Sequence, residues 1–587
     1  MAAAKVKMNA NGAHTFLEIV KVRFGTPAHL VFTFYAVLCN IVVSGSLILG
    51  GAATVNALTG MPIIAACFLL PIGIAVYVVF GGLRATFICD YAHTVVIFTI
   101  IYLFVFRAYG TAEDIGSPSS MYDLLTEAAK IMPVTGNEHG SYLTMKSNQG
   151  LVFAAAGMLT GLSGVFCDQG YWQRAIASAP ESTTKAYMLG GLSWFAVPWA
   201  FASCLGLAAR ALLTNPKFPT YPNPLSASQA SAGLAAPAAA AVLMGKGGAV
   251  AILLVVFMAV TSAASAELIA VSSIFSYDLY RVYWRKAAGG AEIVRVSHWF
   301  IVFWAIWMGA WSAILNRASI DLGWLYYVQG AVLSPAVIPV ALTVGWSRLT
   351  ATGVLWGSIV GAILAVLAWM IGCLKIYGSI NITNLALPYS AICSGVTGLL
   401  FSGVITVVVS LLGHQRYDFA GTRAIAVVDP VDEEDSGVQG VPAEREDSAS
   451  SSAGGQEKNA KDPEAGNTTV TTIPVASETM PPFSSGGTRP PASPEVLQAV
   501  YKKAAWMALA LTLCVTIIVP LPMFFSHYVF SKSFFTFWIA CTIIWAFLSG
   551  TFCIVLPVIE SRRQILTIAR ASFKALRFAG RGDHTKA

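Results

Sequence analysis

The sequence predicts an all-α polytopic membrane protein with about twelve transmembrane helices. Of its 587 residues, 56% are hydrophobic and only 11% are charged, whereas soluble domains carry about 25% charged residues. Because the surface of a soluble protein needs charge, this deficit indicates a surface that faces membrane lipid. Apolar runs of about 20 residues, the length that spans a bilayer, recur along the chain. The expected spans are 29–55, 62–81, 85–106, 151–172, 187–212, 247–275, 297–316, 323–345, 351–374, 388–412, 503–526 and 533–557.

The remaining composition excludes several classes of protein. The 15 Trp and 20 Tyr suit aromatic belts at two membrane interfaces. The formal charge of +7 is spread over many loops, so no nucleic-acid partner is expected. The ten cysteines lie singly inside apolar segments, which predicts small buried side chains rather than disulfides or metal ligands. The first residues are polar and lack an apolar core, so no cleavable signal peptide is expected.

Lys and Arg residues fall on alternate connections, which predicts that those connections and both termini are cytoplasmic. The opposite side receives 107–150, 213–246 and 375–387, and the last of these contains the sequon Asn381-Ile382-Thr383, a glycosylation candidate. The run at 233–244 is short and contains Pro237, so we expect it to be interfacial or re-entrant.

The chain is predicted to have five parts. They are a cytoplasmic N-terminal segment (1–28), a transporter-like core (29–412), a disordered cytoplasmic linker (413–500), two C-terminal transmembrane helices (501–558) and a basic cytoplasmic tail (559–587). Ser, Glu, Gly and Pro dominate the linker between 424 and 499. Kinase action on its serines and an unregulated tether are equal alternatives.

Acidic and polar residues inside apolar runs usually face a cavity, a partner or a pathway. Asp90 follows a break at Gly81-Gly82, and His93 lies one turn further on the same helix face. This pair is a candidate ion or proton handle. The alternative is a structural lock between Asp90 and Arg84 or a neighbouring helix.

A second polar group lies on a helix with a stripe of small residues. Ser262, between Thr261 and Ser265, carries a hydroxyl suited to Na⁺, and Glu267 follows at mid-depth. The hydroxyls alternatively bond to backbone carbonyls of their own helix. Glu267 requires a partner, a proton or water.

Two further segments are candidates for substrate contact. Gly157, Gly161 and Gly164 precede Asp168-Gln169 and predict a weakened or unwound helix, although close packing also explains the glycines. Trp324, Tyr326, Tyr327 and Gln329 precede Pro335 and Pro339, whose freed carbonyls, with the aromatics and the amide, would clasp a small polar solute. An interfacial aromatic belt explains the aromatic cluster equally well. Gly353, Gly357 and Gly361 predict only tight helix packing.

Hydrolase, metalloprotease, P-loop and dinucleotide-binding motifs are absent from the sequence, so an enzyme is not expected. No organic cofactor is expected either. The composition is also compatible with a channel protein, but buried carboxylates on interrupted helices favour a carrier. A nutrient sensor that signals through the linker is a further alternative, as is a membrane enzyme.

Several segments resemble one known family. TFLEIVKVRFG, ILGGAATVNALTG and YVVFGGLRATFICDYAHTVVIF resemble the solute:sodium symporter family. VFCDQGYWQRAIAS, NPKFPTYPNP and VFMAVTSAASAELIAVSSIFSYDLYR are similar to its urea active transporter branch. The resemblance implies a LeuT-like core of two inverted five-helix repeats. It also implies symport of urea, and in some relatives polyamines, across the plasma membrane, driven by H⁺ or Na⁺.

The sequence departs from this family in two respects. TFLE follows the second core helix in the family but lies near the start of this chain, so the first two core helices are expected to be missing, as in a truncated or inactive paralogue without transport. In Na⁺-coupled members an Ala-x-x-Ser-(Ser/Thr) motif binds the ion, and alignment on Tyr277-Asp278-Leu279-Tyr280 places Ala259, Ser262 and Ala263 there. Ala263 replaces a hydroxyl, so this would be a weakened Na⁺ site.

Proton coupling through Asp90 or Glu267 is therefore the favoured hypothesis, with His93 beside Asp90. Urea has two amino donors and one carbonyl, so its site needs acceptors on one side and a donor opposite. Tyr327 and Gln329 are the expected donors, with Trp324 and Gly161 in the same candidate region. Asp168 is a weaker candidate because of its expected position near the cytoplasm.

Overall fold

A computed structural model describes residues 1–178, 180–413, 416–425 and 494–579. Most of the predicted linker, with its candidate phosphorylation sites, lies outside these residues. The described residues are helical with connecting loops. The principal helices are α1 (Ala2–Asn9), α2 (Phe16–Phe24), α3 (Thr26–Thr59), α4 (Ile63–Phe106), α5 (Pro118–Ile131), α6 (Asn148–Cys167), α7 (Gln169–Ala177), α8 (Pro180–Trp194), α9 (Ser203–Ala211), α10 (Ala227–Ser231), α11 (Ala235–Ser273), α12 (Gly290–Arg317), α13 (Leu322–Thr343), α14 (Ala351–Tyr377), α15 (Ile382–Leu385), α16 (Pro388–Leu412), α17 (Ala420–Arg423), α18 (Pro494–Leu513), α19 (Pro520–Phe525), α20 (Lys532–Gly550) and α21 (Leu556–Ala579).

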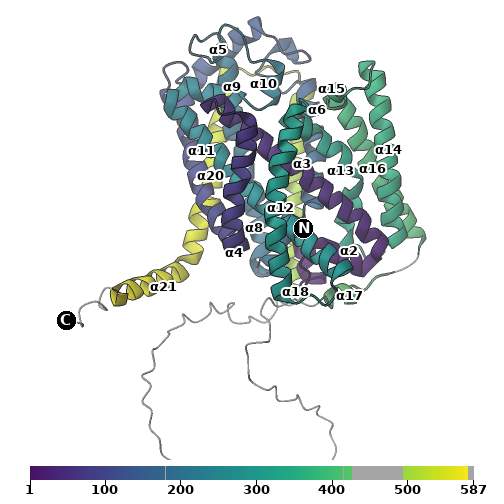
Figure 1. The fold of residues 1–587 in the computed structure, drawn as a ribbon. Coiled ribbons are helices and arrows are strands. Elements are labelled where there is room, and N and C mark those ends of the chain that lie inside the picture. The colour runs from purple at the N-terminus through teal and green to yellow at the C-terminus, as the bar shows by residue number, and fades with distance from the viewer. Residues whose placement is uncertain (179, 414–415, 426–493, 580–587) are drawn as a thin grey trace, which may run out of the picture.

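Within the described part of the chain, five π-helical segments join or extend these helices. They are η1 (Arg107–Thr111), η3 (Val197–Ala202), η4 (Ile274–Trp284), η6 (Cys514–Ile518) and η7 (Thr551–Val555), and a 3₁₀ turn, η2, covers Glu138–Gly140. Figure 1 shows a bundle with two ends. One end carries α5, α9, α10 and α15, and we call it the α5 end; the opposite end carries α2 and α17, and we call it the α2 end.

Among the described residues, 11 helical segments are long and apolar enough to cross a membrane. The sequence predicts about twelve spans, and the difference arises in α4. Its 44 residues would extend about 66 Å as one straight helix, roughly twice the hydrocarbon thickness of a bilayer. Gly82 interrupts it with φ +54° and ψ −153°, a conformation that glycine adopts without strain.

The break at Gly82 turns α4 into a helical hairpin. Leu58, at the end of α3, packs against the same hydrophobic cluster as Met121 and Leu125 of α5. The chain therefore leaves α3 and enters α5 at one end of the bundle, so α4 must run away from that end and return. The predicted spans 62–81 and 85–106 are its two arms.

A second glycine break divides α11. Gly245 has φ +59° and ψ −137°, and the short arm before it buries Ala238, Ala239 and Ala240 in the cluster beneath α5 and α9. This arm corresponds to the run at 233–244 that we expected to be interfacial or re-entrant. The long arm after Gly245 crosses the bundle and carries the polar residues of the site.

The tightest helix contact joins α14 and α16. A Cβ atom added to Gly353, Gly357 or Gly361 would lie 2.2, 1.9 or 2.7 Å from the side chain of Ser410, Thr406 or Ser402, respectively. These separations are shorter than any real contact, so only glycine permits this approach. The three glycines therefore provide the close helix packing that their spacing predicts.

Candidate functional site

A polar cavity of about 400 Å³ opens between α3, α4, α7 and α11. It contains six of the residues that the sequence singled out, namely Asp90, His93, Asp168, Ala259, Ser262 and Glu267. Their helices are distant in sequence, and the turns at Gly82 and Gly245 aim the α4 and α11 arms at the same space. The structure thus gathers the predicted coupling residues, and Asp168 with them, in one place.

Asp90 is held by two partners from other helices. Arg174 of α7 donates to Asp90 Oδ2 over 2.8 Å, and the hydroxyl of Ser262 on α11 donates to Oδ1. Arg84, the partner considered from the sequence, is not the one found. Asp90 therefore links three helices through charge-assisted hydrogen bonds.

His93 lies one turn after Asp90 and lines the same cavity. Its Nδ1 atom is buried and has no hydrogen-bond partner. Buried polar atoms of this kind are rare, because each costs about 1–3 kcal/mol. The imidazole is thus available to a solute or a proton that enters the cavity.

Glu267 and Asp168 form a second, deeper acidic pair. The Glu267 side chain is buried and accepts a hydrogen bond of 2.5 Å from Asn40 Nδ2. The same amide group lies 3.5 Å from Asp168 Oδ1, so Asn40 faces both carboxyl groups. Asp168 also accepts from the backbone N–H of Gly170 at 2.7 Å, which caps α7.

This pair is chemically suited to holding a proton. Two carboxylates that share a dry site repel each other, so one of them is readily protonated. Arg174, which pairs with Asp90, lines the same cavity. The cavity thus contains three carboxyl groups and one arginine.

The hydroxyl groups of α11 have different roles. Thr261 donates to the Phe257 carbonyl at 2.7 Å, and Ser265 donates to the Ser262 carbonyl at 2.8 Å, as in the backbone-bonding alternative. Ser262 donates instead to Asp90 on α4. Ala259 and Ala263 line the cavity beside it without offering side-chain oxygen.

The other predicted substrate residues lie outside this cavity. Trp324 donates through Nε1 to the Ile382 carbonyl at 2.9 Å, beside α15 at the α5 end. Tyr327 lines a separate hollow of about 550 Å³ with Phe153, Tyr377 and Tyr389. Gln329 is buried against α6, and its Nε2 lies 3.5 Å from the Thr160 carbonyl. The structure thus does not bring Trp324, Tyr327 and Gln329 together with Asp168.

The expectation that α6 is unwound at its glycines is wrong. Helix α6 is continuous from Asn148 to Cys167, and its glycines allow close approach: Cβ atoms at Gly157 and Gly164 would lie 2.8 Å from Tyr326 Oη and 3.3 Å from Gln329 Nε2. Nothing lies within 4 Å of a Cβ built on Gly161. The chain breaks instead at Asp168, whose backbone is extended.

The prolines of α13 do not leave carbonyls free for a solute. Pro335 and Pro339 remove the N–H groups that would bond the carbonyls of Ala331 and Pro335. Ser394 and Ser402 of α16 donate to those two carbonyls at 3.1 and 2.5 Å. A neighbouring helix thus satisfies the backbone, as apolar surroundings require.

Sequence reasoning missed Asn40 and Arg174 as members of the site. Asn40 is a fully buried amide in an otherwise apolar stretch of α3, and that isolation was the available signal. Arg174 lies in a connection whose basic residues the sequence assigns to the cytoplasm. Its partner on α4 is 84 residues away, so their pairing could not be predicted from the sequence.

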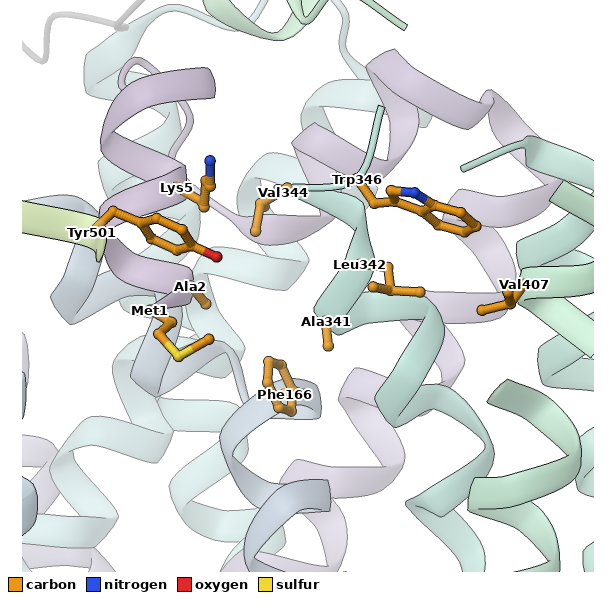
Figure 2. A pocket seen from close by; sticks show the side chains of 11 residues that line it. Met1, Ala2, Lys5, Phe166, Ala341, Leu342, Val344, Trp346, Val407 and Tyr501 are labelled. Atoms are coloured by element: carbon orange, nitrogen blue, oxygen red, sulfur yellow. The ribbon is translucent and has the colours of Figure 1, made fainter. Parts of the chain in front are cut away.

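A further cavity, of about 460 Å³, lies among α1, α13 and α18 (Figure 2). Lys5 is its single charged lining residue, and apolar side chains such as Phe166, Leu342 and Val407 make up most of its walls. It contains no acid and little to orient a polar solute. The cavity with the three carboxyl groups is therefore the candidate functional site.

A bundle of membrane-spanning helices around an acid-lined cavity is the arrangement that ion-coupled secondary transporters use. A Na⁺-coupled sialic acid symporter, solved in a substrate-bound outward-open state, shares the fold with a TM-score of 0.51. That match covers 68% of this chain and 78% of the other, at 16% identity. The chain belongs to the sodium:solute symporter family, whose profile matches residues 2–361.

Relatives within the family are much more similar in sequence. The urea active transporter of Saccharomyces cerevisiae is 38% identical over 97% of this chain and 79% of its own length. The urea-proton symporter DUR3 of Oryza sativa subsp. japonica is 42% identical over 72% of this chain and 59% of its own length. The similarity to the yeast protein thus extends well beyond the family profile.

Proposed function

We propose that this protein is a symporter that imports urea and is coupled to protons rather than to Na⁺. The urea-transporting relatives support the substrate class. The observation that carries the coupling ion is the buried pair of Asp168 and Glu267, which share one amide donor. At the position of the family's Na⁺ motif, Ala263 offers no oxygen and the Ser262 hydroxyl already donates to Asp90, which favours a proton over Na⁺.

Proton loading would begin at the deeper pair. A proton on Glu267 or Asp168 removes the repulsion between the two carboxylates. Asn40 Oδ1 is buried and has no partner, and a rotation of the amide by about half a turn would present this acceptor to the protonated carboxyl group. The loaded state is therefore electrostatically favourable, and release requires the cavity to open to water.

Protonation of Asp90 would change its hydrogen bonds to α7 and α11. When ionised, it holds Arg174 and Ser262. A proton on Asp90 weakens the bond to Arg174 and frees the guanidinium for another acceptor. His93, with its unpartnered Nδ1, is the nearest relay.

Urea would bind against the same groups. Its amino groups need acceptors, and the carboxyl oxygens of Asp168 and Glu267 provide them. Its carbonyl needs a donor, and Arg174 and His93, which line the same cavity, are the candidates. Tyr327, Gln329 and Gly161, in the region between α6 and α13, and Trp324, beside α15, remain predicted substrate contacts, which urea would visit in another conformation.

The family resemblance implies a plasma-membrane protein, and the distribution of Lys and Arg supports an orientation with the α2 end and both termini in the cytoplasm. The α5 end, with Asn381, would then face outward. Asn381 is exposed at the start of α15, where a glycan could attach.

The direct test is uptake of radiolabelled urea by the full chain in proteoliposomes. We expect urea to accumulate under an inward proton gradient in Na⁺-free buffer, and to accumulate little when a Na⁺ gradient replaces the proton gradient. Strict dependence on Na⁺ would overturn proton coupling. Absence of flux under either gradient would overturn symport and favour the inactive-paralogue alternative.

A further inference from the structure

A basic pocket lies at the α2 end, and it shares no residue with the acid-lined cavity. It has a volume of about 520 Å³ and three cationic side chains, Lys21 of α2, Arg281 of η4 and Lys286 just beyond η4. Its one acidic residue is Glu18. The other lining residues are Thr26, Tyr277, Val282 and Tyr283.

The pocket keeps a surplus of positive charge. Among the residues that the structure describes, none of its three cations forms an ion pair. Glu18 is already engaged, because its carboxylate accepts from the His14 backbone N–H at 2.7 Å and lies 3.3 Å from His14 Nδ1. Arg285, in the same segment but outside the pocket, does pair with Glu292, at 3.5 Å.

The cations also repel one another. Partial burial lowers the pKa of Lys21, the ammonium of Lys286 lowers it further, and the Asp278 carboxylate acts in the opposite direction. Lys21 Nζ lies 4.5 Å from the centre of the Tyr283 ring, so its position is fixed by a cation–π contact. An anion bound between Lys21 and Lys286 would relieve their repulsion.

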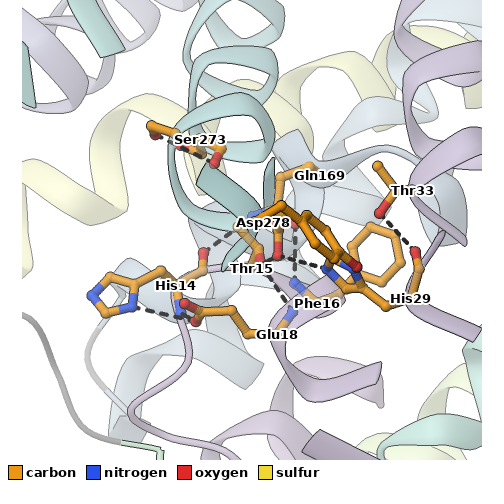
Figure 3. A network of polar contacts seen from close by, with 11 residues as sticks. His14, Thr15, Phe16, Glu18, His29, Thr33, Gln169, Ser273 and Asp278 are labelled. Atoms are coloured by element: carbon orange, nitrogen blue, oxygen red, sulfur yellow. Dashed lines mark hydrogen bonds and ion pairs between the residues drawn. The ribbon is translucent and has the colours of Figure 1, made fainter. Parts of the chain in front are cut away.

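The walls of the pocket are held in place by a buried network (Figure 3). Thr15 donates to Asp278 Oδ1 at 2.9 Å, and His29 Nε2 lies 3.4 Å from the same oxygen. The other ring nitrogen of His29 lies 2.8 Å from Tyr283 Oη. Thr15, His29 and Asp278 are fully buried. The network joins α2, α3 and η4, so the donor groups of the pocket are preorganised.

Exposed tryptophans flank the pocket in sequence. Trp284, next in sequence to Tyr283, is 74% exposed, and Trp299 of α12, the helix that follows Lys286, is 71% exposed. Exposed tryptophans on a membrane protein mark the interface between hydrocarbon and water. Cations gathered beside such a belt are positioned for a lipid headgroup.

We propose that Lys21, Arg281 and Lys286 bind the phosphate of an anionic phospholipid. The Arg281 guanidinium provides a forked donor for phosphate oxygens, and the two ammonium groups provide point charges. The acyl chains would lie along the apolar surface near Trp284. Because the site joins α2 to η4, its occupant stabilises the contact between these two elements.

Binding can be measured on the detergent-solubilised full chain. The probes are dioctanoyl phosphatidic acid, dioctanoyl phosphatidylcholine and inorganic phosphate, each titrated with thermophoresis and thermal unfolding as readouts. The variants are K21Q, R281Q, K286Q and the triple variant, with R285Q as the matched control. Size-exclusion chromatography checks that each variant is folded, and K286Q is the mildest change because Lys286 is exposed in a loop.

We expect phosphatidic acid to bind and to raise the unfolding temperature, and phosphatidylcholine to do neither. The triple variant should bind roughly 100-fold more weakly, each single variant should be intermediate, and R285Q should match the wild type. Equal binding by the wild type and the triple variant, or equal losses in R285Q and R281Q, would overturn the proposal. Inorganic phosphate binding as tightly as the lipid would overturn the lipid source. None of these outcomes depends on urea transport.

Discussion

Glu267 is the residue on which the proposed coupling depends most directly. Glutamine at this position keeps the size of the side chain and can still accept from Asn40, but it cannot exchange a proton. We expect Glu267→Gln to reduce urea uptake under a proton gradient by about 100-fold, the lower end of the range for loss of an acid–base group. Exchange of labelled for unlabelled urea without a gradient should persist, because it requires no net proton movement.

A matched control for this substitution is Glu560→Gln. Glu560 pairs with Lys185 on the surface, and its side chain is 53% exposed, so its loss should change uptake little. Proton-driven uptake by Glu267→Gln at the wild-type rate would contradict the assignment of Glu267.

Asp90 and Arg174 form a pair that a double-mutant cycle can resolve. Asp90→Asn and Arg174→Gln each leave the other group without its partner. We expect each to lower thermal stability, and the double variant to lose less than the sum of the two, with a coupling of roughly 1 kcal/mol. Thermal unfolding in detergent measures all four proteins. Additive losses would show that the bond of 2.8 Å contributes nothing in solution.

At the scale of helices, the contact between α14 and α16 limits which residues are tolerated. A Cβ atom at position 357 would lie 1.9 Å from Thr406 Oγ1 and 2.9 Å from the Ser402 carbonyl oxygen. The hydroxyl can rotate away, but the backbone oxygen cannot. We expect Gly357→Ala to destabilise the protein by about 1–3 kcal/mol, measured as a lower unfolding temperature.

Gly206→Ala on α9 provides the comparison, because nothing lies within 4 Å of a Cβ built there. That change should be neutral or stabilise the helix by up to about 1 kcal/mol, since alanine is the better helix former. A drop in unfolding temperature of the same size in both variants would mean that close packing is not what requires glycine at 357.

The elements also explain where sequence reasoning succeeded. Apolar length alone predicts the spans, and Gly81-Gly82 predicts the turn within α4, because both signals are local. The expected unwinding of α6 and the free carbonyls of α13 failed for a shared reason. Whether a glycine or a proline opens a helix depends on the neighbouring helix, and here Tyr326 covers Gly157 while Ser402 bonds the Pro335 carbonyl.

At the scale of the whole molecule, the polar residues of the cavity were predictable one by one but their pairing was not. Asp90 and Glu267 stand out as acids in apolar runs. Asn40 meets Glu267 across 227 residues of sequence, and only the folded bundle determines that contact. The pocket at Lys21, Arg281 and Lys286 was equally hidden, because its cations come from separate segments and resemble ordinary cytoplasmic charges.

The orientation of the bundle is a property of the whole chain, and it gives the last prediction. Asn381 lies at the α5 end, and Ala287, an exposed residue of the η4–α12 loop, belongs to the α2 end with the basic pocket. If Lys and Arg set the topology, Asn381 faces outward and Ala287 faces the cytoplasm. We expect Asn381→Gln to remove an endoglycosidase-sensitive mass shift in a glycosylating host.

Cysteine labelling tests the opposite face independently. Ala287→Cys should react with a membrane-impermeant maleimide in permeabilised cells and stay unlabelled in intact ones, with the wild type as the background for its native cysteines. Labelling of intact cells at 287 would invert the topology, and the basic pocket would then face outward, away from the anionic lipids of the cytoplasmic leaflet. The same result would reverse the side from which the acid-lined cavity takes up its proton, so one labelling experiment constrains both proposals.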